Sequence, residues 1–80
     1  MGEGRVKKLR WHSRRGMKEL DVLFEAFFAQ QTDTLIAGGW PQLEDLLEQE
    51  DNVLFDWISG RDLPSNPEML KLIDVIADAL

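Results

Sequence analysis

The stretch 20-LDVLFEAFF-28 decides the fold of this chain. Its apolar side chains recur at i, i+3, i+4, i+7 and i+8, which places them on one face of an α-helix: Leu20, Leu23, Phe24, Phe27 and Phe28. The pattern predicts an amphipathic helix that begins at about Met17 and buries its aromatic stripe in the core.

On the amino-terminal side, Val6, Leu9 and Ser13 give a short helix with a narrow apolar edge and a basic outer face. Gly16 is the predicted stop of this helix, because glycine adopts the left-handed conformation without a Cβ penalty. On the other side, helix propensity fades through 30–40, and Gly38-Gly39 breaks the chain before Pro41, which can occupy a helix's first turn.

The rest of the sequence is also helical. A third helix carries Leu43, Leu46 and Leu47 and is interrupted at 50–52. A fourth carries Leu54, Trp57 and Ile58 and ends at Gly60. The last helix begins at 66–67, with Asn66 as N-cap and Pro67 at the first helical position. Its stripe consists of Met69, Leu72, Ile73, Val75, Ile76 and Leu80.

No stretch alternates with period two for long enough to predict a strand, so the fold class is all-α, a compact bundle of five short helices. The 80 residues predict a single helical domain over 1–80, with about residues 1–5 disordered. Without Cys, packing of the helices must supply the stability. The predicted core consists of Leu23, Phe24, Phe27, Leu47, Leu54, Trp57, Ile73 and Ile76.

Charge is distributed unevenly along the chain. Residues 1–18 contain seven of the nine Lys and Arg residues and only Glu3 among the acids, a net charge of +6. Residues 19–80 carry a net charge of −12. The basic segment 1–18 has three possible interpretations. It can be a nucleic-acid-binding arm, a docking face for a protein partner, or a solvated helix whose charges pair with the protein's own acids.

The residue types of an active site are scarce. His12 is the only histidine and there is no Cys, so neither a catalytic residue nor a metal ligand is predicted. The acids of 44-EDLLEQED-51 lie where a solvated helix face belongs. The chain shows no apolar run that could span a membrane and no secretory signal, and we expect a soluble, cytoplasmic protein that does not insert into membranes.

What remains is the segment 14-RRGMKE-19. If the first helix stops at Gly16, Arg15 and Glu19 flank a corner between two helices. As structure, such an exposed pair contributes only about 0–1 kcal/mol. As a binding feature, it presents a guanidinium fork beside a carboxylate, which suits hydrogen bonding to a partner.

These residues also resemble a known family. Trp11 followed by 14-RRGMKELD-21, then 46-LLEQEDNVLFDWISG-60 and Pro64, is similar to the FAD assembly factors of succinate dehydrogenase, bacterial relatives of the mitochondrial succinate dehydrogenase assembly factor 2. The resemblance covers roughly residues 6–77. Its most specific part is the family's Arg-Gly-x-x-Glu signature, here Arg15, Gly16 and Glu19.

The resemblance implies a five-helix assembly factor that is not itself an enzyme. It implies binding to the flavoprotein subunit of succinate dehydrogenase, and possibly of fumarate reductase, and promotion of covalent FAD attachment. The factor then acts on the FAD of its client and binds none tightly itself, and we expect a monomer when it is free. The predicted partner-binding residues are Arg10, Arg14, Arg15, Gly16, Met17, Glu19 and Asp21.

Two other functions stay open, and the sequence departs from the family's pattern in two places. Some family members are labelled antitoxins, and the basic helix would suit a nucleic-acid-binding regulator, although the acidic remainder would repel phosphates. The segment 35-LIAGGWPQLE-44 departs from the family's usual start of the third helix, which leaves the structure around Trp40 open. Ser13 stands where relatives have Cys, so no thiol function is required there.

Overall fold

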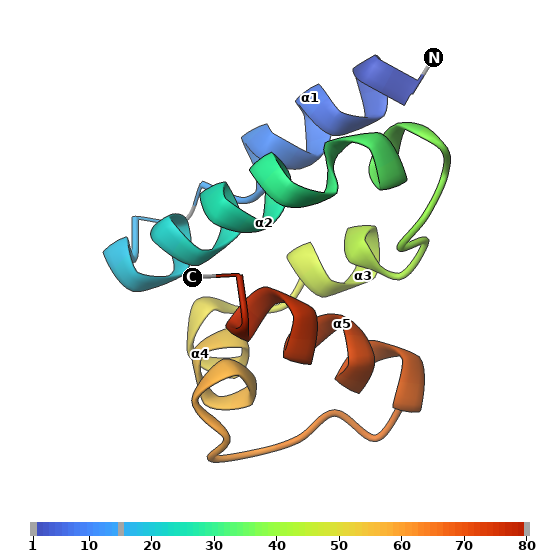
Figure 1. Ribbon diagram of the computed structural model, residues 1–80. Coiled ribbons are helices and arrows are strands. Elements are labelled where there is room, and N and C mark those ends of the chain that lie inside the picture. Colours follow the sequence, from blue (N-terminus) through green and yellow to red (C-terminus); the bar gives the residue numbers. More distant parts are fainter. Residues whose placement is uncertain (1, 15, 80) are drawn as a thin grey trace.

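Five helices and no strand make up the part of the chain that the computed structural model describes, residues 2–14 and 16–79. The helices are α1 (Gly2–His12), α2 (Lys18–Ile36), α3 (Leu43–Leu47), α4 (Asp51–Ser59) and α5 (Pro67–Ala77). Helices α1 and α2 lie side by side, and α5 packs against α2, α3 and α4 (Figure 1). The predicted all-α bundle of five short helices is confirmed.

Helix α1 ends at His12, earlier than predicted. Ser13 explains the early end, because its hydroxyl donates a hydrogen bond of 2.7 Å to the carbonyl of Arg10 and so satisfies an acceptor that a longer helix would use. Gly16 does adopt the predicted left-handed conformation, with φ of 77°, but it lies in the connection to α2 and does not itself close α1. At the other end, residues 2–5 form the first turn of α1, and disorder of about residues 1–5 stays a prediction.

Helix α2 is the longest element and supplies the centre of the core. Its aromatic stripe is buried as predicted, with Phe24, Phe27 and Phe28 at most 1% exposed. The helix runs to Ile36, further than its fading propensity suggests. Leu35 near its end is fully buried, so packing there outweighs the weak local preference.

The carboxyl-terminal half follows its local signals. Asn66 caps α5 by accepting hydrogen bonds from the backbone N–H groups of Glu68 (2.8 Å) and Met69 (3.4 Å), and Pro67 stands at the first helical position. Gly60 ends α4 with φ of 82°. Pro41 lies in a turn before α3 and not inside a helix.

Most of the predicted core is confirmed. Two of its eight residues, Leu23 and Trp57, are only partly buried and pack against the core from its edge. Leu23 lies on the flank of the α2 stripe, roughly a quarter turn from its centre, and a Trp side chain is rarely covered completely. The six that are buried are Phe24, Phe27, Leu47, Leu54, Ile73 and Ile76.

Candidate partner-binding site

The corner between α1 and α2 presents three of the predicted binding residues. Gly16 and Glu19 are exposed, with Glu19 in the first turn of α2. Met17 is half-buried, packs against the core and fixes the start of α2, where its carbonyl accepts the N–H of Asp21 at 3.0 Å. Arg15 lies outside the described residues. Among the described residues, the predicted corner is therefore present, and its glycine (Gly16) and carboxylate (Glu19) are accessible to a partner.

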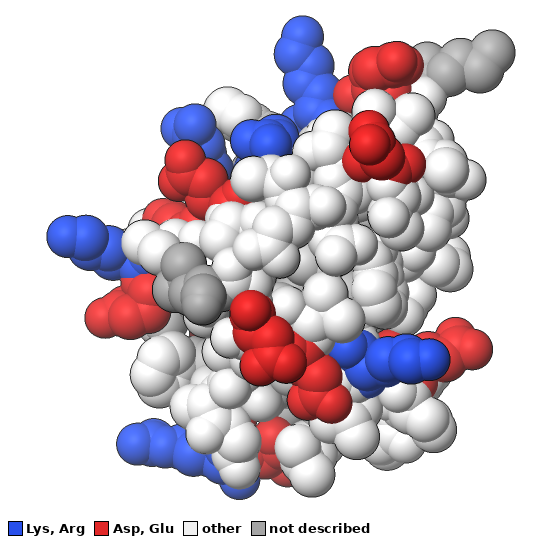
Figure 2. Space-filling view, in the orientation of Figure 1, with Lys and Arg blue, Asp and Glu red and all other residues white. Residues whose placement is uncertain are grey.

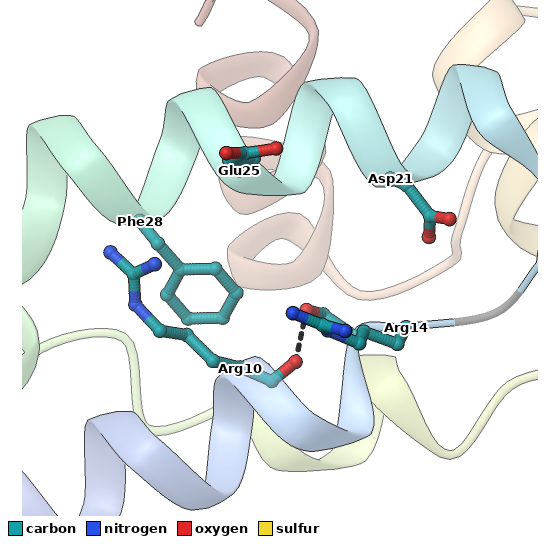
Figure 3. A pocket seen from close by; sticks show the side chains of 6 residues that line it. Arg10, Arg14, Asp21, Glu25 and Phe28 are labelled. Atoms are coloured by element: carbon teal, nitrogen blue, oxygen red, sulfur yellow. Dashed lines mark hydrogen bonds between the residues drawn. The ribbon is translucent and has the colours of Figure 1, made fainter.

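A pocket of about 340 Å³ opens beside this corner, between α1 and α2 (Figure 3). Three predicted binding residues line it, namely Arg10, Arg14 and Asp21. Gly16, Met17 and Glu19 do not. The pocket also has three lining residues that were not predicted as binding residues: Ser13, Glu25 and Phe28.

The pocket has two walls of opposite charge. Arg10 and Arg14 reach into it from α1 and its end, while Asp21 and Glu25 come from α2 (Figure 3). The guanidinium of Arg10 lies over the ring of Phe28, 5.4 Å from its centroid, a cation–π contact. Neither Arg10 nor Arg14 forms an ion pair within residues 2–14 and 16–79, so both guanidinium groups can pair with a carboxylate from outside.

Two of the three pocket residues that were missed, Glu25 and Phe28, have a recognisable spacing relative to Asp21, which was predicted. Asp21, Glu25 and Phe28 follow one another at i, i+4 and i+7 along one flank of α2. The side chain of Phe28 belongs to the buried core and also lines the pocket. Finding this role from sequence would require knowing which flank of α2 faces the end of α1.

Arg5 is a further residue that the sequence did not single out, and it lies outside the pocket at Arg10. Its guanidinium donates to the carbonyls of Leu35 (2.7 Å), Gly39 (2.8 Å) and Trp40 (2.9 Å). It also pairs with the carboxylate of Glu44, at 2.9 and 3.1 Å. One side chain thus ties α1 to the end of α2, to the following loop and to α3.

This clamp settles the structure around Trp40. Trp40 has φ of 54°, a conformation that is uncommon for a bulky residue. Arg5 binds its carbonyl, its indole N–H donates to Gln31 at 3.1 Å, and its ring lies 6.4 Å from that of Phe27. These contacts with Arg5, Gln31 and Phe27 hold Trp40 in this conformation.

Replacing Arg5 by alanine is expected to lower the free energy of unfolding by about 2–4 kcal/mol, because three carbonyls and a carboxylate lose a charged donor. Arg5→Lys should recover only part of the loss, since an ammonium group lacks the planar fork. Urea unfolding measures both. Lys8→Ala, an exposed site on the same helix, is the control and should change stability by less than about 0.5 kcal/mol. Equal stabilities of Arg5→Ala and Lys8→Ala would contradict the clamp.

Glu44 makes part of this stability depend on pH. The hydrogen bond from Arg5 lowers the pKa of Glu44 below its ordinary value of 4.5. The stabilisation is therefore complete above pH 4.5 and is lost as the pH falls from there through the folded-state pKa. We expect the stability difference between wild type and Glu44→Gln to be constant near neutral pH and to shrink below pH 4.5. Unfolding curves recorded from pH 7 to pH 3 test this, and a difference that grows in acid would contradict it.

Basic side chains project along the edge of the molecule where α1 and the α1–α2 corner lie (Figure 2). The uncharged part of this face lies mainly over α2, whereas acidic and basic side chains are visible over α5 (Figure 2). No group of three His, Asp or Glu side chains that could hold a metal ion occurs in the described ranges. Within the same ranges, every helix is too short or too polar to cross a bilayer.

Comparison with known proteins gives a consistent picture. Residues 7–79 match the family model Sdh5, described as flavinator of succinate dehydrogenase. The chain is 40% identical over 67 residues to the FAD assembly factor SdhE of Coxiella burnetii, covering 84% of this chain and 82% of that protein. It is 38% identical over 76 residues to the protein of the same name from Pseudomonas aeruginosa, covering 95% and 90%. No solved structure matches the chain significantly.

Proposed function

Because the chain belongs to the family of succinate dehydrogenase flavinators, we propose that it binds the flavoprotein subunit of succinate dehydrogenase and promotes covalent attachment of FAD to that subunit. The observation that carries the proposal is the family match over residues 7–79, nearly the whole described chain. The names of the relatives support an assembly factor and do not favour a nucleic-acid-binding regulator or an antitoxin.

The corner and the adjacent pocket are the proposed contact surface for the subunit. The exposure of Gly16 and Glu19 supports this role, as do the guanidinium groups of Arg10 and Arg14, which no described carboxylate pairs. Together with Arg15, Met17 and Asp21 they complete the proposed set. A carboxylate on the subunit could bind Arg14 through two parallel hydrogen bonds, which fixes orientation as well as strength.

The chain assists the attachment and leaves the bond-making chemistry to the flavin and the subunit. It has two routes to do so. It can hold the subunit in a conformation that brings the flavin and its acceptor side chain together, a proximity effect. Alternatively, the charged groups of the corner can stabilise charge that develops on the flavin. We further propose that the chain is a cytoplasmic monomer when free, acts without a catalytic residue and holds no FAD tightly; the names of its relatives, assembly factors, support the non-catalytic role.

The direct test is reconstitution. Purified flavoprotein subunit without its flavin is incubated with FAD, with and without the chain, and denaturing gels are read for flavin fluorescence, which only covalently attached flavin retains. We expect more covalent flavin when the chain is present, and a complex of chain and subunit on size-exclusion chromatography. Equal flavin in both samples, with no complex, would contradict the proposed function. Binding to random duplex DNA at low salt would favour the nucleic-acid alternative instead.

A further inference from the structure

Trp11 is the most exposed large apolar side chain of the described residues, at 75% of its full surface. It lies in the last turn of α1, which packs against the core through Val6 and Leu9. At 3.6 residues per turn, Trp11 points almost directly away from that buried face. It lines neither the pocket at Arg10 nor a smaller hollow of about 220 Å³ on the other flank of α1, at Lys8 and His12. Trp11 therefore lies on the outer, solvent-facing side of α1, between these two pockets.

The surroundings of Trp11 are basic. Lys7 and Lys8 lie one turn before it and Arg14 three residues after it, and all three are exposed. One further turn back, Gly4 places no side chain beside this row, and a Cβ there would meet no atom within 4 Å. The protein's own packing therefore does not require glycine at this position, although glycine weakens a helix. At Gly4, two turns before Trp11, another surface can therefore approach the outer face of α1 closely.

From this arrangement we infer that Trp11 is the central anchor of the contact with the flavoprotein subunit, and that the subunit receives the indole in an apolar slot bordered by acidic side chains. The inference rests on the proposed function and names the chemistry of the partner surface. Trp, with Tyr and Arg, is enriched among the residues that dominate binding energy, and such residues are surrounded by contacts that exclude water. The rim here is cationic, so the complementary rim is acidic.

A second copy of the chain fits this surface less well. The acidic residues 19–80 could attract the basic α1 of another copy, but the two surfaces differ, and such head-to-tail contacts extend into polymers unless they close into a ring. A membrane surface also fits poorly, because one indole on a helix joined to a body of net charge −12 meets anionic lipid at a disadvantage.

Binding kinetics against immobilised flavoprotein subunit test the inference. Trp11→Ala should weaken the complex by about 30-fold or more, mainly through faster dissociation. Trp11→Phe should lose less. Leu63→Ala is the matched control, because Leu63 is 59% exposed and lies far along the chain, in the loop after α4; its binding should equal wild type. Reversal of Lys7 and Lys8 to Glu should instead slow association and weaken its dependence on salt.

Fluorescence gives an independent readout. Trp40 and Trp57 are half-buried, so the difference in quenching by acrylamide between wild type and Trp11→Phe reports on Trp11. We expect the subunit to protect Trp11 from acrylamide, and thermal unfolding of Trp11→Ala to match wild type. Wild-type affinity of Trp11→Ala would overturn the inference while leaving the proposed function intact. So would protection of Trp11 only by anionic vesicles or by raised concentration of the chain itself. A wild-type chain that never binds the subunit would contradict the proposed function, and the inference with it.

Discussion

Replacing Phe27 by alanine is expected to lower the free energy of unfolding by about 3–5 kcal/mol, because a fully buried aromatic ring leaves a cavity that the bundle can close only in part. Phe27 packs edge-to-face on Phe28 with ring centroids 5.8 Å apart, and it also contacts Trp40. A chain of 80 residues has a total stability of only about 4–12 kcal/mol. The substitution therefore removes a large part of the total.

Urea unfolding followed by circular dichroism measures this loss. Val22→Ala is the matched control, since Val22 lies on the same helix and is 41% exposed; it should change stability by less than about 1 kcal/mol. Phe27→Leu should fall between the two, because it removes less volume. If Phe27→Ala unfolds at the same urea concentration as wild type, the centre of the core has been misassigned.

The parts of the fold that could be predicted from sequence are those with a local cause. The cap of α5 depends only on Asn66 and its next three residues, and the end of α4 depends only on the left-handed conformation of Gly60. The α2 stripe is equally local, because its period alone identifies the buried face. In each case the deciding contact lies within a few residues.

The parts that could not be predicted depend on contacts between distant segments. Arg5 binds carbonyls and a carboxylate 30 to 39 residues away, and nothing in its neighbourhood distinguishes it from the other cations of α1. The early end of α1 is an exception with a local cause: the Ser13 hydroxyl donates to the carbonyl of Arg10, three residues before it, and the sequence alone does not show that this hydroxyl bonds to the backbone instead of to solvent. For the candidate site, the exposed corner at Gly16 and Glu19 was predictable, whereas the pocket wall formed by Glu25 required the packing of α1 on α2.

Gly16 provides the sharpest test of the corner, because its two possible roles can be separated. Its φ of 77° strains any other residue, yet a Cβ built there meets no atom within 4 Å. Within the free protein, alanine and arginine at this position should therefore destabilise by a similar amount, about 1–2 kcal/mol. Their effects on the client differ only if another surface approaches the corner closely.

We expect Gly16→Arg to abolish most of the covalent flavinylation that the chain promotes, and Gly16→Ala to be milder. Gly60→Arg is the matched control: Gly60 also has a left-handed φ, 82°, and open space around it, but it lies at the end of α4. It should show the same loss of stability and keep its activity. Equal activity of Gly16→Arg and Gly60→Arg would show that position 16 matters only for folding.

Glu19→Ala extends the test to the charged side of the corner. Glu19 is exposed in the first turn of α2, so its removal should lower the free energy of unfolding by only about 0.3–1 kcal/mol. Covalent flavin in the client should nevertheless fall about tenfold or more, because donors of the client that the carboxylate would satisfy lose their acceptor at a dry interface. Glu68→Ala, in the equivalent first turn of α5, is the control and should keep full activity. In-gel flavin fluorescence reads all five variants in one reconstitution. Full flavinylation with both Gly16→Arg and Glu19→Ala would show that the corner is only a turn between two helices.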